Sequence, residues 1–213
     1  NDDVPFIVHP TVATRLSADP EAVALPAASE ALQAGRLPVV MEAIRLLKDG
    51  VGQEIAIGAW IPGPFTLAWQ IVEVEPLLLA IPSPERVAPL LDMSADFLAQ
   101  VAVRYREAGA DFLTIHEMGG SPQIVGPRVF RRLVLPALQR LVSQTPAPRV
   151  LSVCGRTQPI IADLASIGAE AVSVDHQCEL VQARQMIGEE LLLFGNFDPV
   201  GLLAEGTPEA IAE

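Results

Sequence analysis

Short apolar runs alternate with amphipathic stretches along most of this chain, and this order constrains the fold more than any other feature of the sequence. We predict helices between and after the apolar runs, at 84–108, 127–144, 159–167, 180–187 and 207–212. The apolar runs have the length of strands and lie at 54–61, 111–115, 149–153, 171–174 and 191–194. Such alternation predicts parallel strands joined by helices, and therefore an α/β fold.

The segment before the first strand is harder to interpret. Residues 20–49 have a helical pattern with a break at 35–38, and residues 5–8 are compatible with a short strand or an extended lead-in. Half of the 213 residues are hydrophobic, which is enough for one substantial core. We therefore predict a single domain over residues 1–213.

Periodicity alone does not separate a closed barrel from a doubly wound open sheet. No Gly-x-Gly-x-x-Gly fingerprint follows an early strand, and Pro64 lacks the amide donor that a phosphate-binding turn needs. A full barrel needs eight strands, whereas five are clear here, and the last helix has no ending signal. The sequence thus favours a TIM (β/α)8-type barrel whose C-terminal strands are missing from the chain.

Composition excludes several classes of function. The net charge of −12 disfavours a nucleic-acid partner, because such proteins bind phosphates through clustered Lys and Arg. No uninterrupted apolar stretch of membrane-spanning length and no secretory leader is visible. Two cysteines are too few for a disulfide scaffold, so Cys154 and Cys178 are expected to be reduced thiols in a cytoplasmic protein.

Polar residues follow several predicted strands, and the ends of parallel barrel strands converge at one mouth. They are His116, Glu117, Cys154, Asp175, His176, Asn196 and Asp198. Thiolate, imidazole and carboxylate together are zinc ligands, and a catalytic zinc keeps one position open for a substrate such as a thiol. Cys154 is the first ligand we would assign, although a buried packing role is also open for it, and more so for Cys178. A structural role is also open for three of these residues. His116 could be a hydrogen-bonded residue that caps its strand, and Asn196 and Asp198 could belong to an ordinary turn.

Three motifs in order resemble the uroporphyrinogen decarboxylase superfamily. They are Gly63-Pro64-Phe65-Thr66-Leu67-Ala68, Val174-Asp175 and Gly195-Asn196-Phe197-Asp198-Pro199. The residues of the first motif, together with Cys154-Gly155, most resemble its methyltransferase branch. That branch moves a methyl group from a corrinoid protein to a zinc-bound thiol such as coenzyme M, so the resemblance implies zinc, a corrinoid methyl donor and a small thiol substrate.

The resemblance also implies roles for single residues. Cys154 matches a zinc ligand of a His-x-Cys pair, but Ser152 stands where the His is expected, and a Ser hydroxyl is a poorer ligand. Asp175, His176 or His116 are the candidates to compensate. We predict Cys154, Asp175 and His176 as metal ligands, Glu117 and Asp175 as catalytic groups, and Gly63, Phe65, His116, Arg156, Asn196 and Asp198 as residues that bind the substrate or the corrinoid.

Two other functions remain open from the sequence. The decarboxylase branch uses no metal and needs an Arg-rich pocket for a tetrapyrrole that carries many carboxylates. This chain offers few candidates, of which Arg156 is one. A non-catalytic barrel that binds only a corrinoid or a partner protein would explain the loss of the expected His at Ser152.

Overall fold

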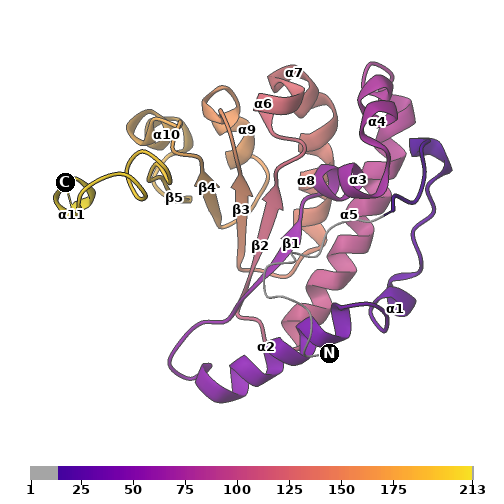
Figure 1. Ribbon diagram of the computed structural model, residues 1–213, viewed down its shortest axis with the longest axis horizontal. Helices are drawn as coiled ribbons and strands as arrows, with labels where there is room; N and C mark the ends of the chain where they lie inside the picture. Colours follow the sequence, from indigo (N-terminus) through magenta and orange to yellow (C-terminus); the bar gives the residue numbers. More distant parts are fainter. Residues whose placement is uncertain (1–13, 213) are drawn as a thin grey trace.

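The computed structural model describes residues 14–212, and its centre is one parallel sheet with helices packed on it (Figure 1). The strands follow the chain in the order β1-β2-β3-β4-β5, and every neighbouring pair is parallel. They are β1 (Gly58–Pro62), β2 (Phe112–Glu117), β3 (Arg149–Val153), β4 (Ala171–Val174) and β5 (Leu192–Phe194). This order confirms the predicted α/β fold and is consistent with part of a (β/α)8 barrel.

Helices precede the sheet, connect its strands and follow its last strand. They are η1 (Pro20–Ala22), α1 (Ala28–Ala31), α2 (Leu37–Val51), α3 (Pro64–Ile71), α4 (Val74–Ala80), α5 (Pro84–Glu107), α6 (Pro122–Val125), α7 (Pro127–Val129), η2 (Phe130–Val134), α8 (Leu135–Gln144), η3 (Gln158–Ile160), α9 (Ile161–Ala165), α10 (Leu180–Ile187) and α11 (Pro208–Ala212). The long helix α5 packs against α8 and α3. In the described part of the chain, no helix is both long and apolar enough to cross a membrane.

The predicted strands 149–153 and 171–174 match β3 and β4 residue for residue. The prediction 54–61 began too early, because α2 runs to Val51 and a turn follows it before β1 starts at Gly58. The prediction 111–115 ended too early. His116 and Glu117 pair with Ser152 and Val153, so both are strand residues and their side chains point to opposite faces of the sheet.

Two predicted helices differ from the structure. The stretch 127–144 is not one regular α-helix but α7, a π-helical turn at η2, and α8. Pro136 has no amide to donate to the preceding turn, which explains the irregular hydrogen bonding upstream of it. Within 20–49, residues 23–27 are not helical, since Pro26 disfavours helical backbone at the residue before it. The predicted segment 5–8 lies outside the described residues.

The two faces of the sheet have different surroundings. Helices cover one face, where Leu113, Ile115, Leu151, Val153 and Val172 are all at most 1% exposed. On the other face, side chains line an open cavity of about 680 Å³. They include Thr114, His116, Ser152, Ser173 and Phe194. In a barrel, this second face is the interior.

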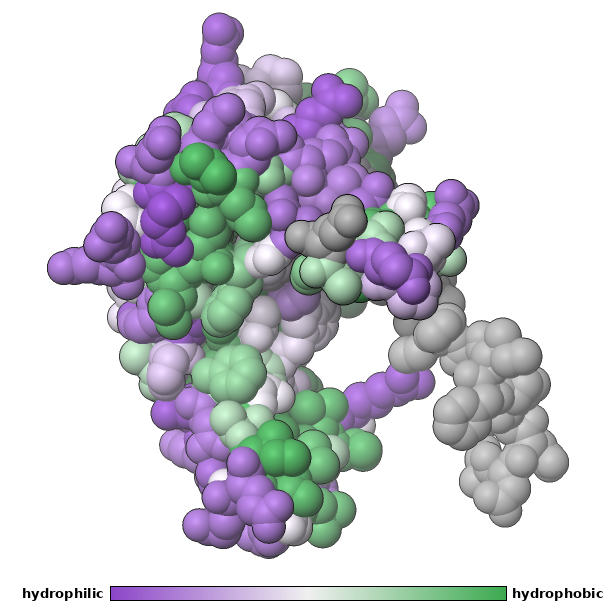
Figure 2. All heavy atoms as spheres, turned by 90° about the vertical axis from the view of Figure 1, so that its left-hand side faces the viewer, coloured by the Kyte–Doolittle hydropathy of each residue, from purple (hydrophilic) through white to green (hydrophobic). Residues whose placement is uncertain are grey.

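The outer edges of β1 and β5 have no partner strand among residues 14–212. Figure 2 looks at the end of the molecule where β5 lies and shows hydrophobic side chains gathered there. Val181, Leu192 and Phe194 are 73%, 57% and 48% exposed. The assignment of residues 1–213 to a single barrel domain that is incomplete at its C-terminus stays a prediction.

Candidate functional site

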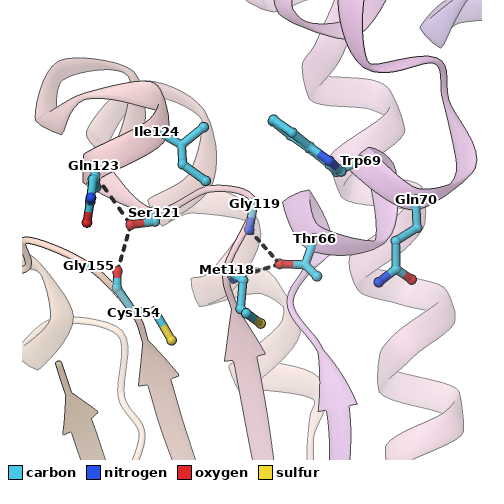
Figure 3. A pocket seen from close by; sticks show the side chains of 10 residues that line it. All are labelled: Thr66, Trp69, Gln70, Met118, Gly119, Ser121, Gln123, Ile124, Cys154 and Gly155. Atoms are coloured by element: carbon cyan, nitrogen blue, oxygen red, sulfur yellow. Dashed lines mark hydrogen bonds between the residues drawn. The ribbon is translucent and has the colours of Figure 1, made fainter. Parts of the chain in front are cut away.

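A cavity of about 510 Å³ opens where β2 and β3 end, beside α3 (Figure 3). Ile124 and Trp69 stand on opposite sides of it, and Cys154 lies at the end of β3. The lining residues are Thr66, Trp69, Gln70, Met118, Gly119, Ser121, Gln123, Ile124, Cys154 and Gly155. The cavity therefore sits at the carboxyl edge of the sheet, where α/β enzymes place their active sites.

One wall of the cavity is α3, which begins directly after β1. Pro64 stands at its first turn, where a missing amide costs nothing and the fixed φ favours a helix. Gly63 precedes it, and the Gly63 amide donates to the His116 carbonyl at 2.7 Å. A Cβ on Gly63 would lie 2.8 Å from Cδ of Glu117, so only glycine lets α3 start this close to β2.

Glu117 lies beneath the cavity on the helix-covered face of β2 and is 0% exposed. Its carboxylate accepts hydrogen bonds from Phe65 N at 3.0 Å, Thr66 Oγ1 at 2.6 Å and Gly120 N at 2.9 Å. Burial raises the pKa of Glu117, and these hydrogen bonds pull it back toward its ordinary value. Phe65 is also fully buried, so neither side chain lines the cavity.

A tight turn after β2 forms the floor of the cavity. The Met118 and Gly119 amides donate to Thr66 Oγ1 at 2.7 and 3.0 Å. A side chain on Gly120 would meet Val134 and Phe65, so this position also requires glycine. This turn was not predicted from the sequence. The signal for it is Gly119-Gly120-Ser121-Pro122, a run of turn-forming residues directly after an apolar strand.

Cys154 is the predicted site residue that does line the cavity. Its carbonyl accepts a hydrogen bond from Ser121 Oγ at 2.6 Å, which ties β3 to the turn after β2. Burial raises the pKa of the Cys154 thiol, and the negative charge of Asp175 raises it further. The thiol is therefore mostly protonated at neutral pH unless another group stabilises the thiolate.

Asp175 and His176 follow β4 and do not line this cavity. Asp175 Oδ1 lies 3.0 Å from His176 Nδ1 and accepts from the Gln177 amide at 3.0 Å. Arg156 Nε donates to the Gln177 side chain at 3.2 Å. These residues thus form a polar group beside β4, next to Cys154 but separate from the cavity floor.

The remaining predicted residues lie elsewhere. His116 lines the open interior face of the sheet and packs edge-on against Trp60 with ring centroids 5.5 Å apart, and burial lowers its pKa. Asn196 Nδ2 donates to the carbonyls of Asp175 and Cys178 at 3.0 and 2.6 Å. Asp198 accepts from two amides of its own turn, which lowers its pKa.

The residues predicted to bind a metal do not form a complete ligand set in the described chain. Among residues 14–212, no three His, Cys, Asp or Glu side chains converge as a metal site. Cys154 and Asp175 are close enough to influence each other electrostatically, while Ser152 contributes no strong ligand. These residues therefore supply at most part of a zinc site.

Comparison with known proteins identifies the family to which the chain belongs. A model of the family described as Uroporphyrinogen decarboxylase (URO-D) matches residues 3–213. The chain belongs to the uroporphyrinogen decarboxylase family. Within the family, a methylcobamide:CoM methyltransferase of Methanosarcina barkeri is 30% identical over 193 residues, which are 90% of this chain and 56% of that protein.

Other family members show similar likeness. A solved structure described as a methyltransferase from Methanosarcina mazei superposes with a TM-score of 0.84 at 31% identity, over 91% of this chain and 57% of the other. A uroporphyrinogen decarboxylase of Xanthomonas axonopodis pv. citri (strain 306) is 31% identical over 189 residues, 82% of this chain and 52% of that protein. The chain thus spans about half the length of the relatives it matches.

Proposed function

We propose that this chain is part of a cytoplasmic methyltransferase that moves a methyl group from a methylated corrinoid, carried by a partner protein, to a small thiol. The observation that carries the proposal is the cavity at the carboxyl ends of β2 and β3, which has a cysteine thiol in its lining. The likeness to a methylcobamide:CoM methyltransferase supports the same reaction.

The reaction breaks the bond between the methyl carbon and cobalt and forms a carbon–sulfur bond on the acceptor, whose thiol proton must leave. In this chain, Trp69, Met118 and Ile124 supply the apolar walls of the cavity. Thr66 and Ser121 are occupied in holding the backbone. Gln70 and Gln123 also line the cavity. We assign them to orienting the substrate by hydrogen bonds to its polar groups other than the thiol.

Zinc activation of the thiol is the finer part of the proposal, with Cys154 and Asp175 as ligands and His176 or His116 in place of the expected His. Among residues 14–212, the His, Cys, Asp and Glu side chains do not complete a zinc ligand set. Elemental analysis tests this part. Absence of stoichiometric zinc, or zinc that survives Cys154→Ala, would remove it.

Absorbance spectroscopy tests the reaction itself. Purified protein mixed with methylcobalamin and a thiol such as coenzyme M should convert the methylcobalamin spectrum to that of demethylated cobalamin, and Cys154→Ala should slow this conversion. A variant far from the cavity, Gln100→Ala on the exposed face of α5, is the control.

A second candidate, uroporphyrinogen decarboxylation, is favoured by the likeness to the Xanthomonas decarboxylase. Its assay is the loss of carboxylates from uroporphyrinogen, followed by chromatography of the oxidised porphyrins. Activity there without methyl transfer would replace the methyltransferase proposal. Binding of cobalamin without either activity would indicate a non-catalytic corrinoid-binding barrel.

A further inference from the structure

The hydrogen bonds around the buried Glu117 carboxyl group indicate its protonation state. All three of its hydrogen-bond partners, Phe65 N, Thr66 Oγ1 and Gly120 N, sit at donor distance. Two of the three are backbone amides, which only donate. The direction of the third bond depends on how the Thr66 hydroxyl is used.

The Thr66 hydroxyl is fixed as a donor to Glu117. Its oxygen already accepts from Met118 N at 2.7 Å and Gly119 N at 3.0 Å, which uses both lone pairs. Its single hydrogen therefore points at Glu117 Oε1, 2.6 Å away. A protonated Glu117 would have no acceptor for its own hydrogen among these groups.

The structure thus assigns Glu117 as an ionised, buried positioning residue that holds the turn after β2 and, through it, Cys154. No ion pair between Glu117 and a Lys or Arg occurs among the described residues, and its charge is stabilised by the partial positive charges of the Phe65 and Gly120 amides and of the Thr66 hydroxyl. The carboxylate does not itself line the cavity, so it acts on the site through the residues that it holds, among them the lining residue Thr66.

A continuous series of hydrogen bonds links Glu117 to Cys154. Glu117 fixes Gly120 directly, and Thr66 fixes Met118 and Gly119. The Ser121 amide donates to the Met118 carbonyl at 3.1 Å, and Ser121 Oγ donates to the Cys154 carbonyl at 2.6 Å. The position of Cys154 at the cavity therefore depends on the buried carboxylate of Glu117 in the neighbouring strand β2.

This inference deepens the proposed function, because it concerns the cysteine that the proposal places in the site, but its test requires no methyl transfer. The probe is the rate at which iodoacetamide alkylates Cys154, measured by mass spectrometry of the Cys154 peptide. Glu117→Gln keeps the shape of the side chain but turns an amide group toward N–H or O–H donors. We expect alkylation to accelerate roughly fivefold or more, the size that follows from losing one buried hydrogen bond.

Matched variants separate this role from general destabilisation. Thr66→Val, which keeps the shape but removes the hydroxyl, should accelerate alkylation similarly, whereas Thr66→Ser should stay near the wild-type rate. The control is Glu170→Gln, which removes a hydrogen-bonded carboxylate beside Arg149 at the other end of the sheet. It should leave the rate of Cys154 alkylation unchanged.

Infrared difference spectroscopy distinguishes an ionised Glu117 from a protonated Glu117 that has only a structural role. The spectrum of wild type minus Glu117→Gln should contain a carboxylate band and no carboxylic-acid band. A carboxylic-acid band, or a folded Glu117→Gln with wild-type alkylation, would overturn the inference. If Glu117→Gln fails to fold, the comparison of Thr66→Val with Thr66→Ser decides, and equal rates would refute it.

Discussion

Adding one methyl group at Gly63 is a direct test of the contact between α3 and β2. Gly63 has φ −75°, which alanine adopts without strain, so the variant Gly63→Ala changes sterics alone. Its Cβ would lie 2.8 Å from Cδ and 2.9 Å from Cβ of Glu117, and closer still to Oε2. Real Cβ atoms essentially never approach this closely, so Glu117 or α3 must move.

The cost follows from what would have to move. Forcing an extra carbon into a packed site costs about 1–3 kcal/mol. Pulling Glu117 away from a buried donor costs about 1–3 kcal/mol more. The reduced flexibility of the unfolded chain returns about 0.4–1 kcal/mol. We therefore expect Gly63→Ala to lower the free energy of unfolding by roughly 1–5 kcal/mol.

Urea unfolding followed by far-UV circular dichroism measures this difference. Gly50→Ala in α2 is the control, because nothing lies within 4 Å of its added Cβ, and it should leave stability unchanged or raise it by up to about 1 kcal/mol. In a Glu117→Ala background the same methyl at Gly63 should cost less than in the wild type, since Oε2 and Cδ are gone and only the 2.9 Å contact with Cβ remains. An unchanged stability of Gly63→Ala would refute the steric argument and favour the predicted binding role for Gly63.

Three further outcomes are expected. Leu151→Ala on the helix-covered face of β3 should lower the free energy of unfolding by about 2–5 kcal/mol in the same urea assay, because this side chain is 0% exposed. The Arg149 side chain lowers the pKa of Glu170 below its ordinary value. The stability difference between wild type and Glu170→Gln should therefore be fully present at neutral pH and vanish as the pH falls through the lowered pKa, and a difference that grows toward acid pH would contradict this. Asp175→Asn should lower the pKa of Cys154 and speed its alkylation at fixed pH in metal-free protein, and an unchanged rate would show that the charge of Asp175 does not reach the thiol.

The strands could be predicted where their residues are apolar and β-branched, as in β3 and β4. The prediction failed at the end of β2, because His116 and Glu117 were placed just after the strand and belong to it. A carboxylate within a strand is tolerated there because donors from residues 65, 66 and 120 surround it. Two of these donors lie more than fifty positions away along the chain, so local sequence carries no sign of them.

The site was predicted in part for a related reason. Cys154 was found because it follows an apolar strand and matches a family motif. Thr66 and Ser121 were missed because a hydroxyl residue looks the same in a sequence whether or not it bonds a distant backbone. Their importance comes from the approach of α3 and β3 to one turn, which only the folded chain reveals.

The strand register narrows the choice among the side chains predicted to replace the missing His at Ser152. His116 is paired with Ser152 on the neighbouring strand, and both line the interior face of the sheet. An imidazole at position 116 therefore lies at the same level as the expected His, one strand away, while His176 follows the end of β4 and contacts Asp175. Neutral imidazole is the form that binds metal, and burial favours that form of His116 by lowering its pKa. A search for the compensating ligand should therefore begin with His116→Ala, with Cys154→Ala as its reference.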